Sequence, residues 1–239
     1  MSGSIKYDGI IAFSKAGSDS NLQLDLRNWA INMPAPVRKT NGSAMSGQVN
    51  IKTLNDANNS NRISWTGKIG DLYTLDGGIN RDSQLRFGLG IGGPAISPQQ
   101  GLQLNIASND LNADEWQHFF QANKANRTQE AKGNSSSSTV NTLITAQVKR
   151  LTLFDRLWQD VNVSANNKKN AWELRISSPQ ASGQIQYQES QKLNTNDLIS
   201  GRFARLKIAD VAMTTDSGTK NPPAPKKILR PESIPSLDI

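Results

Sequence analysis

Apolar and polar residues alternate along most of this chain. From Asn21 to Arg27 every second residue is leucine, and the residues between the leucines are polar. A period of two places the leucines on one face of a pleated strand and the polar side chains on the other. The same alternation returns many times in both halves of the chain, in short runs separated by Asn, Gly, Asp or Ser of turn character. The pattern predicts many strands that each have one apolar face.

The apolar positions of these runs have two interpretations. If the sheet folds on itself as a sandwich, they form a dry core; if the sheet stays open, they line a groove, because a large exposed apolar area is unusual on a soluble monomer. The residues alone leave both interpretations open. The candidate lining residues are Leu22, Leu24, Leu26, Leu102, Leu104, Ile106, Ile144, Val148, Val161, Val163, Leu174 and Ile176.

The connections between the predicted strands are mostly of turn length. Residues 76–78, Asp-Gly-Gly, and residues 166–170, Asn-Asn-Lys-Lys-Asn, are candidate hairpin turns. Residues 154–160 fit either a helical turn or a continued strand. Parallel strands need long crossovers, usually helical, so turn-sized connections favour an antiparallel meander over any βαβ arrangement.

One short helix is predicted after Asn112. Asn112 is a suitable N-cap, two acidic residues follow it, and aromatic residues stand at 116, 119 and 120 with helical spacing. The segment from Asn123 to Ser138 is polar and ends in four serines, which predicts a flexible loop. The predicted fold class is therefore mainly β, an antiparallel curved or twisted sheet with one short helix.

The domain organisation follows from changes in composition. Residues 1–4 resemble a cloning scar, and a segment rich in Pro and Lys near the other end predicts an extended linker. The predicted divisions are a sheet region over 5–212, with two candidate repeats around 5–122 and 139–212 joined by the polar loop 123–138, the linker 213–233, and the start of a truncated strand over 234–239.

Composition removes several classes of chemistry. The chain of 239 residues has no Cys and one His, which argues against thiolate catalysis, Fe–S clusters and the common zinc sites. The absence of Cys is compatible with an oxidising compartment. A net charge of +7 favours anionic partners. The basic residues are scattered and lack interleaved aromatic residues, so we expect no nucleic-acid binding, with lipid headgroup contact at a groove rim as a minor alternative.

The remaining candidate catalytic features are weak. His118 has no other His or Cys to form a metal site, and the glycines between 88 and 93 are not followed by a helix that could bind phosphate. The acidic residues do not single out one pair for hydrolysis. We therefore predict no catalytic residue, no cofactor and no metal. The acidic residues considered were Asp71, Asp76, Asp82, Asp114 and Glu115.

Several runs resemble one family. Residues 26–39, LRNWAINMPAPVRK, resemble the DLxGLxxxLPAPLxK segment of the YhdP branch of the AsmA-like proteins of Gram-negative bacteria. Asn-Trp replaces the small Gly-Leu pair of that segment. Further similar runs follow in the family's order at 85–102 (LRFG…GL), 111–116 (LNADEW), 172–183 (WELRISSPQASG), 204–208 (ARLKI) and 234–238 (IPSLD).

The resemblance implies an internal or C-terminal part of a long, non-enzymatic periplasmic protein. It implies repeated β-grooves of the β-taco kind that carry phospholipid acyl chains between the inner and outer membranes. The partners it implies are the inner membrane, through an N-terminal anchor outside this sequence, and outer-membrane components. The alternative function is a structural or adhesive β-sandwich module that binds protein or carbohydrate and uses its apolar residues as core.

Overall fold

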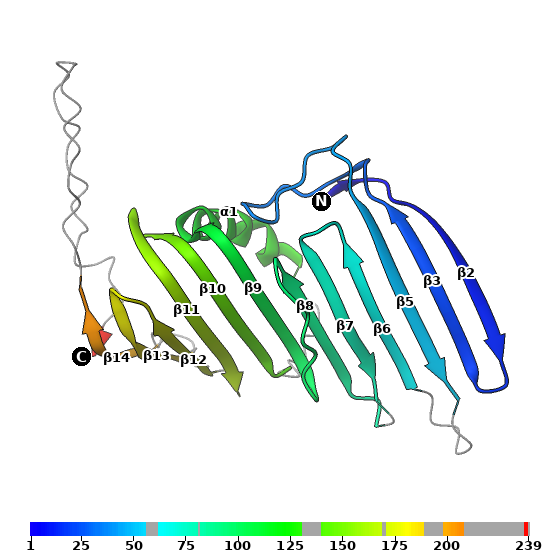
Figure 1. The fold of residues 1–239 in the computed structure, drawn as a ribbon. Coiled ribbons are helices and arrows are strands. Elements are labelled where there is room, and N and C mark those ends of the chain that lie inside the picture. Colours follow the sequence, from blue (N-terminus) through cyan, green and yellow to red (C-terminus); the bar gives the residue numbers. More distant parts are fainter. Residues whose placement is uncertain are drawn as a thin grey trace.

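The protein is mainly one large β-sheet. A computed structural model describes residues 1–55, 62–80, 82–130, 140–168, 171–188, 198–207 and 237–238; for 124–130, 168 and 237–238 it describes the backbone alone. Thirteen strands form the large sheet in the order β15-β14-β13-β12-β11-β10-β9-β8-β7-β6-β5-β3-β2, and β1 pairs with β4 beside it (Figure 1).

The first half of the chain supplies nine strands. Their bounds are β1 (Ser2–Gly3), β2 (Lys6–Ser14), β3 (Gly17–Asp25), β4 (Trp29–Ala30), β5 (Ser46–Leu54), β6 (Arg62–Ile69), β7 (Tyr73–Ile79), β8 (Leu85–Ile91) and β9 (Gly101–Asn112).

The helix and the other strands follow. They are α1 (Ala113–Glu130), β10 (Thr142–Leu153), β11 (Arg156–Lys168), β12 (Ala171–Ser177), β13 (Ala181–Gln188), β14 (Leu198–Leu206) and β15 (Leu237–Asp238).

Most strand pairs are antiparallel, which confirms the predicted mainly β fold with one helix. The sheet is nevertheless mixed, because β8–β9, β9–β10 and β14–β15 are parallel. The preference for a meander over a βαβ arrangement was wrong at one place, since β9, α1 and β10 form such a unit. The order of the strands is linear rather than closed, so β2 and β15 are the two edges of an open sheet.

Helix α1 begins where the sequence predicts and ends later. The Asn112 Oδ1 atom accepts from the backbone N–H groups of Asp114 and Glu115, each at 3.1 Å, as an N-cap does. The helix continues to Glu130 and spans 18 residues, so the prediction of a loop from Asn123 was wrong over its first part. Ala, Lys, Arg, Gln and Glu in this stretch favour a helix although they are polar or small. The rest of that loop, 131–138, lies outside the described residues.

Two turn predictions need correction. Residues 76–78 lie inside β7, where a Cβ on Gly77 would collide with the indole of Trp65, so that glycine serves close packing within the sheet. The segment from 154 contains neither a helical turn nor a continued strand at its start. Phe154 and Asp155 form the turn between β10 and β11, both with φ of 56°, and β11 begins at Arg156.

The hairpin predicted at 166–170 is shorter than expected. Asn166 and Asn167 belong to β11, and Lys168 pairs with Ala171, so the connection is 169–170, outside the described residues.

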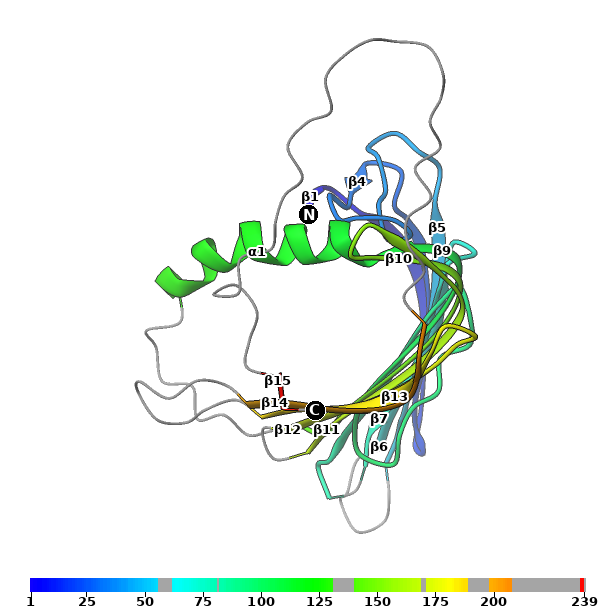
Figure 2. The ribbon, with the colours of Figure 1, turned by 90° about the vertical axis from the view of Figure 1, so that its left-hand side faces the viewer.

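The sheet runs without a break through both predicted repeats, because β9 pairs with β10. In the C-terminal segment, Leu237–Asp238 pairs with β14, while the predicted linker 213–233 lies outside the described residues. The sheet is strongly curved, and α1 lies on its concave side (Figure 2).

Buried side chains are few, and most of them gather in two places. Val148, Leu151 and Val161 form a cluster near the start of α1, joined by Ala113 of the helix and by other partly buried residues of β9–β12. Leu26 and Ile31 are buried near the short strands β1 and β4. Most of the sheet lies outside these two clusters, so hydrogen bonding between paired strands is what chiefly holds it together.

Candidate functional site

Register partners form a row of apolar residues and glycines across the whole sheet. Each member faces the next on the neighbouring strand, and the row contains no polar side chain. From β2 to β14 the members are Gly9, Leu22, Val49, Gly67, Leu75, Leu89, Leu104, Ile144, Ala165, Leu174, Ile185 and Gly201.

A second row lies two residues away along the strands. It is also apolar or glycine throughout, with Tyr73 and Tyr7 as its amphipathic members. Its members are Tyr7, Leu24, Gly47, Ile69, Tyr73, Ile91, Ile106, Ala146, Val163, Ile176, Gly183 and Phe203.

A third row lies on the other side of the first and is rich in aromatic residues. Ser20, Thr142 and Asn167 interrupt it. Its members are Ile11, Ser20, Ile51, Trp65, Gly77, Phe87, Leu102, Thr142, Asn167, Trp172, Tyr187 and Ile199. Since successive side chains point to opposite faces, the three rows share one face, which we call the apolar face.

The positions between these rows are mostly polar, with Ile10 and Leu143 as exceptions in the row between the first and third apolar rows. The row between the first and second apolar rows consists of Asp8, Gln23, Gln48, Lys68, Thr74, Gly90, Asn105, Thr145, Ser164, Arg175, Gln184 and Arg202. Side chains on this polar face bond to one another, as Asn21 Nδ2 does to Asn50 Oδ1 at 2.8 Å. The two faces of the sheet therefore differ sharply in chemistry.

The apolar face lies on the inside of the curve. Ala113, at the start of α1, packs against the Val148, Leu151 and Val161 cluster, and α1 stands on the concave side (Figure 2). The connection from β8 to β9 lies on the other face, where Thr74 Oγ1 donates to Gly93 O at 2.7 Å. The concave surface is therefore apolar and the convex surface polar.

Most of the apolar face is half-buried rather than sealed. No second sheet covers it within the described ranges. At the β2 edge the side chains are open, with 76% of Tyr7 and 82% of Phe13 exposed. An uncovered concave face fits the groove interpretation better than the sandwich interpretation.

The predicted lining residues separate into two groups. Val148 and Val161 belong to the dry cluster, and Leu26 is buried just beyond the end of β3. The others lie half-buried on the apolar face, where their lining role remains a prediction: Leu22, Leu24, Leu102, Leu104, Ile106, Ile144, Val163, Leu174 and Ile176.

Other members of the same face were absent from the predicted lining residues. Trp65, Tyr73, Trp172 and Tyr187 add aromatic surface to it, and Leu75 and Leu89 fill its centre. Several of these stand in runs with the same alternation. Their place in a common row depends on strand register, which a single sequence does not contain.

A loop between β4 and β5 borders one end of the apolar face. Tyr73 OH donates to Val37 O at 3.0 Å, and burial raises the pKa of the Tyr73 phenol. Lys39 is 4% exposed, and its ammonium donates to the backbone oxygens of Trp29 at 2.7 Å, Thr40 at 3.2 Å and Arg27 at 3.3 Å. These contacts hold the loop at this end of the apolar face, which we call the rim.

Two acidic residues at the base of α1 have structural partners. The Asp114 carboxylate accepts from the backbone N–H groups of Phe154 at 2.8 Å and Asp155 at 2.9 Å. Asp110 forms a paired interaction with Arg150, whose hydrogen bonds lower the pKa of the carboxyl and raise that of the guanidinium. Among the described residues, no three His, Asp or Glu side chains gather as a metal site would require.

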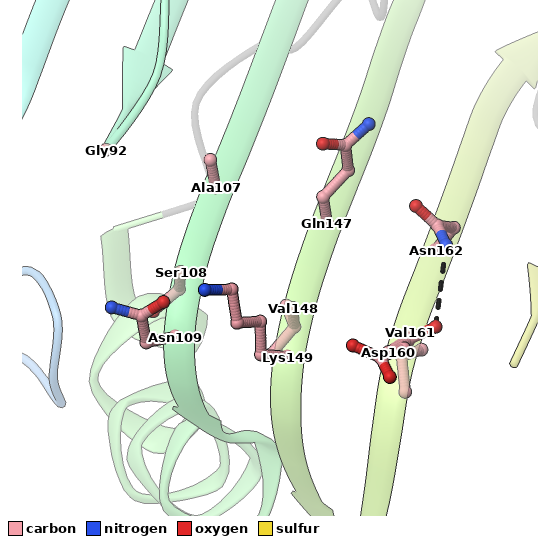
Figure 3. A pocket seen from close by; sticks show the side chains of 10 residues that line it. All are labelled: Gly92, Ala107, Ser108, Asn109, Gln147, Val148, Lys149, Asp160, Val161 and Asn162. Carbon is pink, nitrogen blue, oxygen red and sulfur yellow. Dashed lines mark hydrogen bonds between the residues drawn. The ribbon is translucent and has the colours of Figure 1, made fainter.

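A separate hollow of about 350 Å³ lies over β9, β10 and β11 (Figure 3). Its side chains include Asn109, Lys149 and Asp160, and the register partners Gln147 and Asn162. These polar positions alternate with those of the apolar rows. The hollow is thus a feature of the polar surface rather than part of the apolar face.

The whole chain, residues 1–239, matches the sequence profile of the family described as YhdP protein. The chain belongs to the YhdP family. Membership supports an AsmA-like protein of the lipid-transport type, in a non-enzymatic family of the bacterial envelope. Neither the curated proteins nor the solved structures contain a match. Among the helices in the described part of this YhdP-family chain, none combines the length and apolar character that crossing a membrane requires.

Proposed function

We propose that this part of a YhdP-family protein shields the acyl chains of phospholipids while they cross the periplasm of a Gram-negative bacterium. The apolar face binds the hydrocarbon, and the headgroups stay on the open side in water. The full protein would be held in the inner membrane by an N-terminal anchor and would deliver lipid toward outer-membrane components. No step of this function requires catalysis.

One observation carries the proposal, namely the row from Gly9 to Gly201 that crosses the sheet without a polar side chain. Burial of each methylene group against such a surface stabilises the complex by about 0.8 kcal/mol. Strands are about 4.8 Å apart, so the row offers a continuous apolar path of roughly 50 Å, several times the reach of a compact pocket.

The shape of the face also supports transport over storage. Ligand pockets that hold one molecule combine an apolar wall with a few converging polar groups. The central row has none. In the third row Thr142 and Asn167 are register partners on β10 and β11, and Ser20 stands apart from them on β3. An apolar path without a fixed polar contact suits a ligand that must also leave.

The test uses two substitutions on neighbouring residues of β9. Leu104 belongs to the central apolar row, and Gln103 lies beside it on the polar face. The chain and its Leu104→Asp and Gln103→Asp variants would be purified from a Gram-negative host and analysed by native mass spectrometry with lipid extraction. We expect phospholipid on the parent and on Gln103→Asp, and its loss from a folded Leu104→Asp variant.

Circular dichroism would establish that each variant keeps its sheet. A folded parent that carries no phospholipid and binds none when it is added would contradict the proposal. That result would favour a structural or adhesive module instead.

A further inference from the structure

Helix α1 is an unusual crossover. A helix that connects two parallel strands ordinarily lies along the sheet and buries an apolar stripe on it. α1 contacts the sheet chiefly at β10 and through Ala113 at its first turn, and then runs away from the sheet across the open side of the curve (Figure 2). Beyond its first turn the helix therefore makes little direct contact with the sheet.

The aromatic side chains of α1 pack on one another. Trp116, Phe119 and Phe120 have ring centroids 5.6 to 6.1 Å apart, and 58% of Phe120 is exposed. The cluster formed by Val148, Leu151 and Val161 includes Ala113 of the helix but none of these rings. Trp116 and Phe119 are partly buried, so the cluster keeps an exposed edge at Phe120. An aromatic cluster with an exposed edge on the concave side of the sheet indicates a binding surface rather than a finished core.

The base of α1 is fixed firmly. The Asp114 carboxylate binds the turn between β10 and β11, as described above, and the Trp116 indole N–H donates to Ala35 O at 3.0 Å in the loop at the rim. The turn between β10 and β11 and the loop at the rim thus hold the first two turns of the helix, so its base keeps a defined place on the sheet.

We propose that α1 is a roof over the groove at β9–β11 and that Trp116, Phe119 and Phe120 contact the acyl chain from the side opposite to the sheet. The hydrocarbon fills the space that the helix leaves and covers the rings. This inference rests on the proposed function, since it assigns further binding residues to the same ligand.

The test is fluorescence quenching by a phosphatidylcholine with bromine atoms midway along both acyl chains, loaded from detergent. Bromine quenches only tryptophans that it contacts. The chain has five tryptophans, and Trp65 and Trp172 lie on the apolar face itself. Three variants would each keep Trp65, Trp116 or Trp172 and carry Phe at the other four positions. If these variants do not fold, the emission lost from the parent is compared with that lost from Trp116→Phe.

We expect loss of emission from all three tryptophans, and no loss with the unbrominated lipid. Quenching of Trp65 and Trp172 but not of Trp116 would contradict the proposed contact between α1 and the acyl chain, and would leave the proposed function intact. If no tryptophan is quenched, both the proposed function and the proposed contact between α1 and the acyl chain are contradicted. A second variant, Phe120→Gln, should reduce the amount of retained phospholipid, whereas Gln121→Ala on the exposed helix surface should not.

Discussion

Leu104 of β9 and Ile144 of β10 are register partners on parallel strands, although the whole of α1 lies between them in the sequence. Their pairing continues the central row across the point where the chain leaves the sheet and returns. The two halves of the chain consequently share one apolar face, which continues without interruption from β9 to β10.

The dry cluster and the open face should respond differently to truncation. Val161 is 1% exposed, whereas Val163, two residues along the same strand, is half-buried. Val161→Ala should lower the free energy of unfolding by about 2 kcal/mol, because it removes two buried carbon groups and leaves a cavity. Val163→Ala should lower it clearly less. Urea unfolding of both variants measures the difference, and equal losses would show that the face is as dry as the cluster.

Lys39 should stabilise the loop at the rim more than any exposed basic residue. Lys39→Met removes the donor to three backbone oxygens while keeping most of the apolar stem, and it should cost about 1–3 kcal/mol. Hydrogen exchange should become faster at the Ile31 and Lys39 amides, which bond to each other's carbonyl groups. Arg38→Met, at an exposed neighbour, is the control, and the same acceleration there would contradict a specific role for Lys39.

Asp114 should fix the angle of α1. Asp114→Ala removes the acceptor of two backbone N–H groups in the turn between β10 and β11, at a cost of about 1–3 kcal/mol. Exchange at the Phe154 and Asp155 amides should accelerate, while the β12 amides should keep their protection. Glu115→Ala, which changes the next helix residue, should leave the Phe154 and Asp155 amides protected.

Tyr73 should make the rim sensitive to alkali. Burial raises the pKa of its phenol above the ordinary 10.0, so folding favours the neutral form that donates to Val37 O. This contribution is fully present below pH 10.0 and is lost as the pH rises through the raised value in the folded protein. Urea unfolding at neutral and alkaline pH should show a steeper alkaline loss in the parent than in Tyr73→Phe. Tyr7→Phe, at an exposed position, should behave like the parent.

The strands were predictable because their alternation is local. A few residues of sequence are enough to show which side chains of a strand share a face, as for Leu22 and Leu24 or for Leu102 and Leu104. The parallel pairing of β9 with β10 was not predictable in this way, because a polar helix separates them and its polar residues read as a loop. The Asp76–Gly78 segment was mistaken for a turn because its glycines are required by neighbours such as Trp65, which lie on other strands.

The sequence predicted that the candidate site is an apolar face of the sheet, but it predicted only some of the residues on that face. Periodicity identifies residues that share a face, but it does not distinguish Val161, which is buried in the cluster beside Ala113, from Val163, which packs against that cluster and stays half-buried. That difference depends on tertiary packing near the start of α1. The aromatic members Trp65 and Trp172 enter the same row through strand register, which arises only when the sheet is assembled.

The row from Gly9 to Gly201 presents an apolar residue or a glycine at every strand, about every 4.8 Å. An acyl chain on the apolar face that moves by one strand loses contacts at one end and regains similar contacts at the other. Its free energy would then vary little with position, so that random thermal steps along one dimension suffice to carry it. Net direction would come from the supply of lipid at one end and its removal at the other, with no energy-consuming step inside this part of the protein.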